Sequence, residues 1–451
     1  MKKQAKRHPS NADGRRQVYF DNASTTPLDP RVLAAMMPYF TDDFGNPSNL
    51  YGAGRCARSA VDKASEQIAK VLHCRTDEFI FTGGATEADN LALVGTARAY
   101  KGSGNRIIIS SLEHKGIMAV CDELEKEGFE IIKLPVGKDG MISPDEVGKH
   151  LNGKTILVSI TMADSETGTL QPIKEIAELI RKFRGENERQ GGGDGANNSI
   201  GTKSQLPYFH TDACQAAAYA DINVDKLGVD LMTLSAHKIR GPKGIGGLYV
   251  RKGLKLKPII YGGGQQGNLR SGTENVPAIV GFGKAVELNQ AYKVKGRAGT
   301  KKLRDMLQKG IFKSIDKVVL NGHKSKRLPN FLNISILDIE GESLLLELDE
   351  HGIMINTGSA CNSESLEPSY VLSAMGNPYE FIHGSIRFTL GHDTREADVR
   401  YVLKCLPKIV DRLRAISPLN ISMTEKKDMS DPRAFLGAKT PHFLRKKGGG
   451  K

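Results

Sequence analysis

The sequence predicts an α/β protein with two domains, a larger one built on a mostly parallel sheet and a smaller α+β one. Short apolar runs of strand length alternate with segments of helical periodicity over the first two-thirds of the chain. That alternation is typical of βαβ units, whose parallel sheets carry helices on both faces. Near residue 295 the sequence becomes basic and helix-rich, with only a few strand-like runs. A chain of 451 residues has room for two or three domains.

The larger domain is expected over residues 31–295. Its helices are predicted where apolar residues recur on one face, as they do between residues 60 and 72 and along Ile173–Phe183. Short apolar runs between such helices predict the strands. These are Glu78–Phe81, Arg106–Ser110, Phe129–Lys133, Thr155–Ile160, Tyr208–His210, Leu231–Leu234 and Gly246–Val250.

The smaller domain is expected over residues 296–417, and the segment 18–30 is expected to join it. A long helix, about Val276–Gln290, leads into this part of the chain. Beyond it, apolar runs predict strands and amphipathic runs predict helices. The strands lie near Val318–Leu320, Asn330–Ile336 and Ser385–Leu390, and the helices near Glu342–Glu350 and Glu396–Arg414.

Most of the net charge of +13 lies at the two ends of the chain. Residues 1–17 hold six basic side chains and one acidic, and residues 418–451 hold eight and three, so each end carries +5. Both ends are predicted to be disordered, solvated tails, and the low-complexity stretch 185–203 a flexible insertion. Aromatic residues are sparse among the basic ones. The sequence therefore does not favour a nucleic-acid partner, and any such binding would be electrostatic and sensitive to salt.

Composition and cysteine spacing exclude several classes of protein. Mean hydropathy is -0.34 and no apolar run approaches the roughly 18 residues of a membrane helix. The basic N-terminus has no apolar core, so no secretory signal is expected. Scattered cysteines without metal-ligand spacing predict no metal site and a reducing compartment, the cytoplasm. They are Cys56, Cys74, Cys121, Cys214, Cys361 and Cys405.

A lysine in the segment Ser235–Gly247 carries the first chemical signal. Lys238 follows a strand-like run and precedes a glycine-rich turn. Where burial or neighbouring cations lower its pKa, such a lysine forms a Schiff base with an aldehyde cofactor. On this segment alone, a surface lysine in a basic loop is an equally good interpretation.

A carboxylate follows the predicted strand Tyr208–His210. Asp212 lies where the carboxyl end of a parallel strand opens into the ligand crevice of an α/β sheet. A pyridoxal phosphate enzyme needs a carboxylate there, because it keeps the ring nitrogen protonated and the ring electron-withdrawing. Taken alone, Asp212 is better interpreted as a helix N-cap.

A glycine pair predicts an anion site. The strand ending at Phe81 runs into Gly83 and Gly84, and a helix is expected to open at Ala85 or Thr86. Free N–H groups at a helix start bind phosphate, and glycines let the backbone approach it closely. A tight strand-to-helix turn with an ordinary cap remains the alternative.

Cys361 is the one cysteine that the sequence marks as reactive. It lies within 356–370, a polar loop of small residues between a predicted strand and a predicted helix. Structural cysteines usually lie among apolar residues, whereas reactive thiols are exposed in polar surroundings. We therefore expect Cys361 to be the nucleophile of the chain.

Together these segments resemble the NifS/IscS-type cysteine desulfurases. These are pyridoxal phosphate enzymes of the class V aminotransferase family, with the aspartate aminotransferase-like fold called fold type I. The long loop around Cys361 resembles the branch with an extended cysteine loop. The resemblance covers roughly residues 18–417. Besides the segments above it rests on Asp21–Pro30, Gly45–Ser48, Glu113–Lys115, Arg270–Asn275 and Ser385–Phe388.

The resemblance implies a set of residues that bind pyridoxal 5'-phosphate. Lys238 would hold it covalently, Asp212 would pair with its ring nitrogen, and Gln215 would bond its ring oxygen. Ser165 stands where the family usually has a second asparagine toward that oxygen, so a hydroxyl replaces an amide. The phosphate would be bound by Ala85, Thr86, Ser235 and His237, and by Thr273 of a neighbouring subunit in a homodimer with shared active sites.

The resemblance also implies the reaction. Lys238 would remove the α-proton of L-cysteine, His114 would stack on the ring and move protons, and Arg387 would pair with the substrate carboxylate. Cys361 would take the sulfur as a persulfide, and L-alanine would leave. The sulfur would pass to an acceptor protein for iron–sulfur cluster assembly, to tRNA thiolation, or to both.

Two other functions stay open at this stage. A selenocysteine lyase would use the same residues. A non-catalytic scaffold would be marked by loss of the lysine or the cysteine, and both are present as Lys238 and Cys361.

Overall fold

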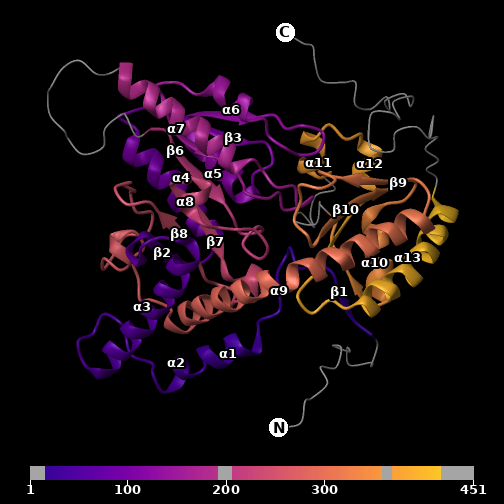
Figure 1. The fold of residues 1–451 in the computed structure, drawn as a ribbon, viewed down its shortest axis with the longest axis horizontal. Helices are drawn as coiled ribbons and strands as arrows, with labels where there is room; N and C mark the ends of the chain where they lie inside the picture. Colours follow the sequence, from indigo (N-terminus) through magenta and orange to yellow (C-terminus); the bar gives the residue numbers. More distant parts are fainter. Residues whose placement is uncertain (1–15, 191–205, 358–367, 418–451) are drawn as a thin grey trace.

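The computed structural model describes residues 16–190, 206–357 and 368–417. Figure 1 shows a large sheet with its helices on the left and a small sheet with its helices on the right. One long helix, α9, runs between them. The predicted α/β fold is therefore confirmed. The expected tails, much of the expected insertion and Cys361 lie outside the described residues.

The large sheet has seven strands in the order β2-β8-β7-β6-β5-β3-β4. All neighbouring strands are parallel except at β8, which runs antiparallel to both β2 and β7. The sheet is thus mixed and mostly parallel, as predicted. The strands are β2 Phe79–Thr82, β3 Arg106–Ser110, β4 Glu130–Leu134, β5 Thr155–Ser159, β6 Tyr208–Asp212, β7 Leu231–Ser235 and β8 Gly246–Val250.

Helices cover both faces of this sheet, because its central strands are apolar on both sides. Alternate residues of β3 show this: Ile108 joins one core with α3, α7 and α9, while Ile107 joins another with α4 and α5. The helices of this half are α1 Pro30–Met36, α2 Pro38–Thr41, α3 Gly52–Leu72, α4 Ala85–Tyr100, α5 Lys115–Lys126, α6 Pro144–His150, α7 Ile173–Gln190 and α8 Val224–Leu227. Three short 3-10 helices are η1 Thr76–Glu78, η3 Ala236–Ile239 and η4 Gln266–Asn268.

The small sheet has the order β12-β10-β9 and is antiparallel throughout. A separate parallel pair joins β1, near the N-terminus, to β11. Val18 and Phe20 are buried in the same core as the small sheet, so the N-terminal segment packs there. The elements are β1 Val18–Tyr19, β9 Val318–Asn321, β10 Phe331–Ile336, β11 Ile353–Met354, β12 Ser385–Thr389, α10 Gly341–Glu350, α11 Tyr370–Ala374, α12 Tyr379–His383 and α13 Glu396–Ile416.

Two helices are longer than the sequence predicted. Helix α7 continues from its expected end at Phe183 to Gln190, past the expected start of the insertion. The residues after Gly185 include glutamate, arginine and glutamine, which are good helix formers, and one glycine costs only about 1 kcal/mol.

Helix α9 spans Val276–Ser314 and is 39 residues long, so the expected boundary at 295/296 falls inside it. Its first half buries Phe282 against the large sheet, and its second half buries Ile311 in the core of the small sheet. One helix therefore serves both cores.

In the described ranges, no helix is both long and apolar enough to cross a membrane.

Candidate active site

A cavity of about 1040 Å³ lies where the two halves of the molecule meet. Its walls come from the start of α4, the carboxyl ends of β6 and β7, the segment 23–25, and β12. Most of the residues expected at the site line this one cavity. They are Ala85, Thr86, His114, Ser165, Asp212, Gln215, Ser235, His237, Lys238 and Arg387.

One end of the cavity is suited to an anion. Helix α4 begins there without a side-chain cap, so no side chain occupies the N–H groups of its first turn. Close packing holds this turn in position, since a Cβ at Gly246 would lie 2.7 Å from the Gly84 carbonyl carbon.

His237 lies at the same end, on η3, and its Nδ1 is 3.1 Å from Thr25 Oγ1. Burial, together with the charges of Lys238 and Lys243, lowers the pKa of His237 to about 4, so the ring is neutral at pH 7. It can serve an anion as a neutral hydrogen-bond donor.

Lys238 occupies the middle of the cavity, also on η3. Its Nζ donates to the carbonyl oxygen of Ala23 and, at 3.0 Å, to that of Ser24. Burial lowers the pKa of Lys238, and the charge of Arg387 acts in the same direction. An amine with a lowered pKa is neutral more of the time, which makes it a better base and a better nucleophile toward an aldehyde.

Asp212 ends β6 and lines the same cavity, and its Oδ1 accepts from the backbone N–H of Cys214 at 2.9 Å. Two strand residues away, His210 is fully buried. Its Nδ1 lies 2.8 Å from Ser159 Oγ and its Nε2 lies 3.0 Å from Thr233 Oγ1. Burial lowers the pKa of His210 to about 4, so this histidine is neutral.

A second carboxyl group, Asp89 on α4, also lines the cavity and was missed from the sequence. Its Oδ1 is 3.8 Å from His210 Nε2 and has no hydrogen-bond partner among the described residues. Burial raises the pKa of Asp89 well above its usual range, and the charge of Asp212 raises it further. Asp89 therefore holds a proton. In the sequence this segment draws attention through its glycines. The signal that could have identified Asp89 is a carboxyl group on the side of the predicted helix that faces the sheet.

His114 and Gln215 each have one polar atom engaged by the protein. His114 caps α5, where its Nδ1 accepts from the N–H of Gly116 at 3.1 Å. The proton of the neutral ring is therefore on Nε2. Gln215 donates from Nε2 to the carbonyl oxygen of Ala23 at 3.0 Å.

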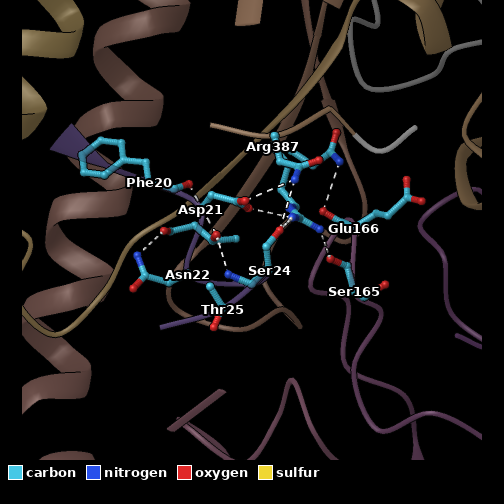
Figure 2. Close-up of polar contacts among 12 residues, drawn as sticks. Phe20, Asp21, Asn22, Ser24, Thr25, Ser165, Glu166 and Arg387 are labelled. Atoms are coloured by element: carbon cyan, nitrogen blue, oxygen red, sulfur yellow. Dashed lines mark hydrogen bonds and ion pairs between the residues drawn. The ribbon is translucent and has the colours of Figure 1, made fainter. Parts of the chain in front are cut away.

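Arg387 enters the cavity from β12 and is held on two sides (Figure 2). Its Nη2 donates to Asp21 Oδ1 at 2.7 Å and to Ser24 Oγ at 2.9 Å, while Nη1 donates to the Ser165 carbonyl oxygen at 2.8 Å. Asn356 lies next to this group, because it exchanges backbone hydrogen bonds with Arg387. A buried cation with a fixed orientation suits the binding of a carboxylate.

Two further buried carboxyl groups were also missed from the sequence. Burial raises the pKa of Glu113 and of Glu166 to about 8. Glu113 Oε1 accepts from Thr161 N at 2.9 Å, and Glu166 Oε2 accepts from Ser369 Oγ. Of the two, Glu166 lines the cavity. Glu113 belongs to the segment Glu113–Lys115 that carries the family resemblance, but nothing in the sequence shows that either glutamate is buried.

Of the expected residues, Thr273 is exposed and does not line this cavity. Cys361 lies outside the described residues. The described residues on either side of the cysteine segment do reach the cavity. Asn356 lines it before the segment, and Tyr370, whose hydroxyl donates to the Glu113 carbonyl oxygen at 2.8 Å, lines it after.

No group of three or more His, Cys, Asp or Glu side chains in the described ranges is arranged to hold a metal ion.

Comparison with known proteins finds close relatives over most of the chain. The aminotransferase class-V family model matches residues 18–186 and 199–402. The chain is 46% identical over 404 residues to the cysteine desulfurase IscS of Dictyoglomus turgidum (strain DSM 6724 / Z-1310), covering 90% of this chain and 97% of that protein. It is 47% identical over 402 residues to the cysteine desulfurase IscS of Methanosarcina thermophila, covering 89% and 94%.

A solved structure described as a NifS-like protein superposes with a TM-score of 0.79. It is 34% identical to this chain, and the match covers 88% of this chain and 100% of the other.

Proposed function

This chain belongs to the aminotransferase class-V family and is a pyridoxal-phosphate-dependent cysteine desulfurase, and from that premise we propose that its cavity removes the sulfur of L-cysteine and leaves it on Cys361. One observation carries the proposal. An anion-binding helix start, an amine of lowered pKa, a carboxylate at a strand end and a buried arginine line a single cavity.

The residues present fit pyridoxal phosphate. The uncapped start of α4, with Ser235 and His237, would bind the phosphate, Lys238 would hold the aldehyde, and Asp212 would pair with the ring nitrogen. When bound, the cofactor supplies an electron-withdrawing ring that accepts the electron pair left by the substrate's α-proton.

Lys238 would move that proton. A lysine with an ordinary pKa is protonated at neutral pH and cannot accept one. Burial lowers the pKa of Lys238, so its Nζ is able to take a proton from the substrate and return it. His114, with its ring proton on Nε2, is a further group in the cavity that can donate one.

Arg387 would bind the substrate carboxylate. Arg387 as a residue is only 7% exposed, so water competes little for its N–H groups. A carboxylate bound there lies in the same cavity as Lys238, which supports the orientation of the α-carbon toward that amine.

Cys361 would act last. Its thiolate would form a new S–S bond to the substrate sulfur while the substrate C–S bond breaks, leaving a persulfide on the protein and releasing L-alanine. Asn356 and Tyr370, on either side of the cysteine segment, both line the cavity, which supports an approach of this segment to the substrate.

The test is release of alanine and sulfide from L-cysteine in the presence of a reductant. We expect equal amounts of the two products from the unaltered protein and none from Lys238→Ala or Cys361→Ser. Cys56→Ser is the matched control, because Cys56 is exposed and does not line the cavity. A Cys361→Ser protein that still releases sulfide would contradict the role of Cys361.

A homodimer is proposed on separate grounds. The segment 33–51 exposes large apolar side chains close together in the sequence, and such patches mark interfaces. They are Leu33, Met37, Phe40, Phe44, Leu50 and Tyr51. In a dimer the exposed Thr273 would be available to the partner's cofactor phosphate. Light scattering should give twice the mass of the chain, 49.1 kDa each.

A reducing compartment, the cytoplasm, is proposed from the thiols. Every cysteine in the described ranges is free, and a persulfide forms only on a reduced thiol. From such a persulfide, sulfur would pass to an acceptor protein for iron–sulfur cluster assembly, to tRNA thiolation, or to both. Incubating the persulfide form with each class of acceptor and measuring transferred sulfur distinguishes the two.

A further inference from the structure

Ser24 lines the cavity beside Arg387 (Figure 2). Both acceptor directions of its hydroxyl are occupied. Arg387 Nη2 donates to Ser24 Oγ at 2.9 Å, and Asn356 Nδ2 donates to it at 3.1 Å. A guanidinium nitrogen can only donate. Ser24 Oγ must therefore be the acceptor toward Arg387.

The amide of Asn356 is oriented by Asp21. Asn356 Nδ2 lies 3.2 Å from Asp21 Oδ2, and Asp21 Oδ1 accepts from Arg387 at 2.7 Å. A carboxylate paired with an arginine accepts hydrogen bonds and does not donate, so the NH₂ side of the amide must face Asp21. The same NH₂ group reaches Ser24. Asp21 thereby fixes both donors that point at the Ser24 hydroxyl.

The hydroxyl hydrogen of Ser24 is still available to donate a hydrogen bond. A serine hydroxyl has one hydrogen and two acceptor lone pairs. With both lone pairs taken, the hydrogen must point in the remaining direction, and no described residue accepts it. Ser24 is exposed and lines the cavity, so an unused hydrogen-bond donor is available to whatever enters there.

Arg387 by itself has too few free N–H groups to bind both oxygens of a carboxylate. Both hydrogens of Nη2 are used, by Asp21 and Ser24, and one hydrogen of Nη1 is used by the Ser165 carbonyl. Nε is buried and has no partner among the described residues. The two remaining hydrogens, one on Nη1 and one on Nε, lie on different edges of the planar guanidinium. No edge therefore offers two free N–H groups side by side. A carboxylate bound by Arg387 thus keeps one oxygen in need of another donor.

We propose that Ser24 is a substrate-binding residue of this site and that its hydroxyl donates to the α-carboxylate of the amino-acid substrate beside Arg387. Asp21 and Asn356 are positioning residues, since they orient the donors that hold the Ser24 hydroxyl. The inference rests on the proposed function, which makes L-cysteine the substrate and Arg387 its carboxylate partner.

The test compares Ser24→Ala with Ser24→Thr, which keeps the hydroxyl, and with Ser314→Ala, a remote serine at the end of α9. We expect Ser24→Ala to raise the KM for L-cysteine about tenfold, equivalent to about 1.4 kcal/mol, with kcat within twofold. Ser24→Thr should stay within threefold of the unaltered holoenzyme, and Ser314→Ala should match it. An unchanged KM in Ser24→Ala would overturn the proposal.

A binding measurement separates this proposal from the proposed function. Calorimetric titration of the holoenzyme with L-alanine needs no turnover, and Ser24→Ala should bind L-alanine about tenfold more weakly. Cysteamine, which has no carboxylate, should bind the unaltered and Ser24→Ala proteins equally. Equal weakening for both ligands would overturn the role of Ser24 in carboxylate binding. Absence of alanine release from L-cysteine by the unaltered protein would instead contradict the proposed function, while the L-alanine titration would still test Ser24.

Discussion

The two ends of the cavity are built in different ways. Asp212 and His210 lie on β6, and the start of α4 directly follows β2, so both parts belong to the large sheet and the helix that leaves it. The opposite end joins Asp21, from near the N-terminus, to Arg387 on β12, which lies 366 positions later in the sequence. The cofactor end is thus built on one sheet, with segment 23–25 packed against it, whereas the carboxylate end exists only when the N-terminal segment meets β12.

The difference extends to charge. At the cofactor end the buried groups beside Asp212 are neutral, because burial keeps Asp89 protonated and His210 deprotonated. At the carboxylate end an ion pair is itself buried, with side-chain exposures of 8% for Arg387 and 13% for Asp21. Substitutions at the cofactor end should therefore change mainly the rate of the reaction. Substitutions at the carboxylate end should change both the stability of the protein and its affinity for the substrate.

Arg387→Ala should have the largest effect and breaks the carboxylate end. It leaves the Asp21 carboxylate in a poorly solvated site without its cation, which we expect to lower the free energy of unfolding by about 3 kcal/mol. It should also lower kcat/KM for L-cysteine by at least about 100-fold. Urea unfolding and steady-state kinetics check the two parts.

Arg387→Lys is the control for that variant. It keeps the positive charge and loses the planar fork, so stability should recover most of its loss while kcat/KM stays low. An Arg387→Ala protein as stable as the parent would contradict the structural part of this prediction.

Asp212→Asn and Asp89→Asn form a matched pair at the cofactor end. Asparagine in place of Asp212 cannot hold a proton on the cofactor ring nitrogen, and turnover should fall at least about 100-fold. Asp89 is already neutral because burial raises its pKa, so an amide of the same shape should change turnover less than threefold. Alanine release from L-cysteine measures both. A comparable loss in the two variants would show that Asp89 carries charge.

Glu113 and Glu166 predict a pH dependence of stability. Burial raises their pKa from the ordinary 4.5 to about 8. Between these values the folded protein holds protons that the unfolded chain has lost. The free energy of unfolding should therefore fall as pH rises from about 4.5 to 8, by up to about 1.4 kcal/mol per pH unit for each group.

Glu113→Gln and Glu166→Gln should each make that dependence less steep, because a glutamine does not titrate. Chemical unfolding at several pH values checks this. If the free energy of unfolding of a variant changes with pH as steeply as that of the parent protein, the prediction for that glutamate is wrong.

Ser165→Asn should have the smallest effect, since Ser165 lines the cavity between the two ends. An amide reaches further than a hydroxyl toward the cofactor's ring oxygen. We expect a shift of less than about one unit in the pH midpoint of the cofactor absorbance, with activity retained. Identical titration curves for parent and variant would eliminate this role of Ser165.

Much of the cofactor end could be predicted from the sequence. Lys238, Asp212 and the glycine pair before α4 lie at junctions where a short apolar run ends and a polar or glycine-rich turn begins. Such junctions coincide with the carboxyl edge of a parallel sheet, so the pattern gives both the fold and the position of the residues. The alternation that predicted seven strands also gave their approximate bounds.

The tertiary structure decided the remainder. Asp89, Glu113 and Glu166 look like ordinary acidic residues in the sequence, and only burial against the sheet changes their pKa. Helix α9 continues past residue 295 because its two halves pack on different cores, which local periodicity does not record.

The carboxylate end depends most on the tertiary structure. The sequence by itself determined the α/β fold and the residues that mark the cofactor site, because strand ends and turns are local features. The partners of Arg387, and the two occupied lone pairs of Ser24, follow from contacts between Asp21, Ser24 and Asn356 across more than 300 residues of sequence. Such contacts form only when the N-terminal segment packs beside β12. No local sequence pattern indicates which residues so far apart in the sequence will meet.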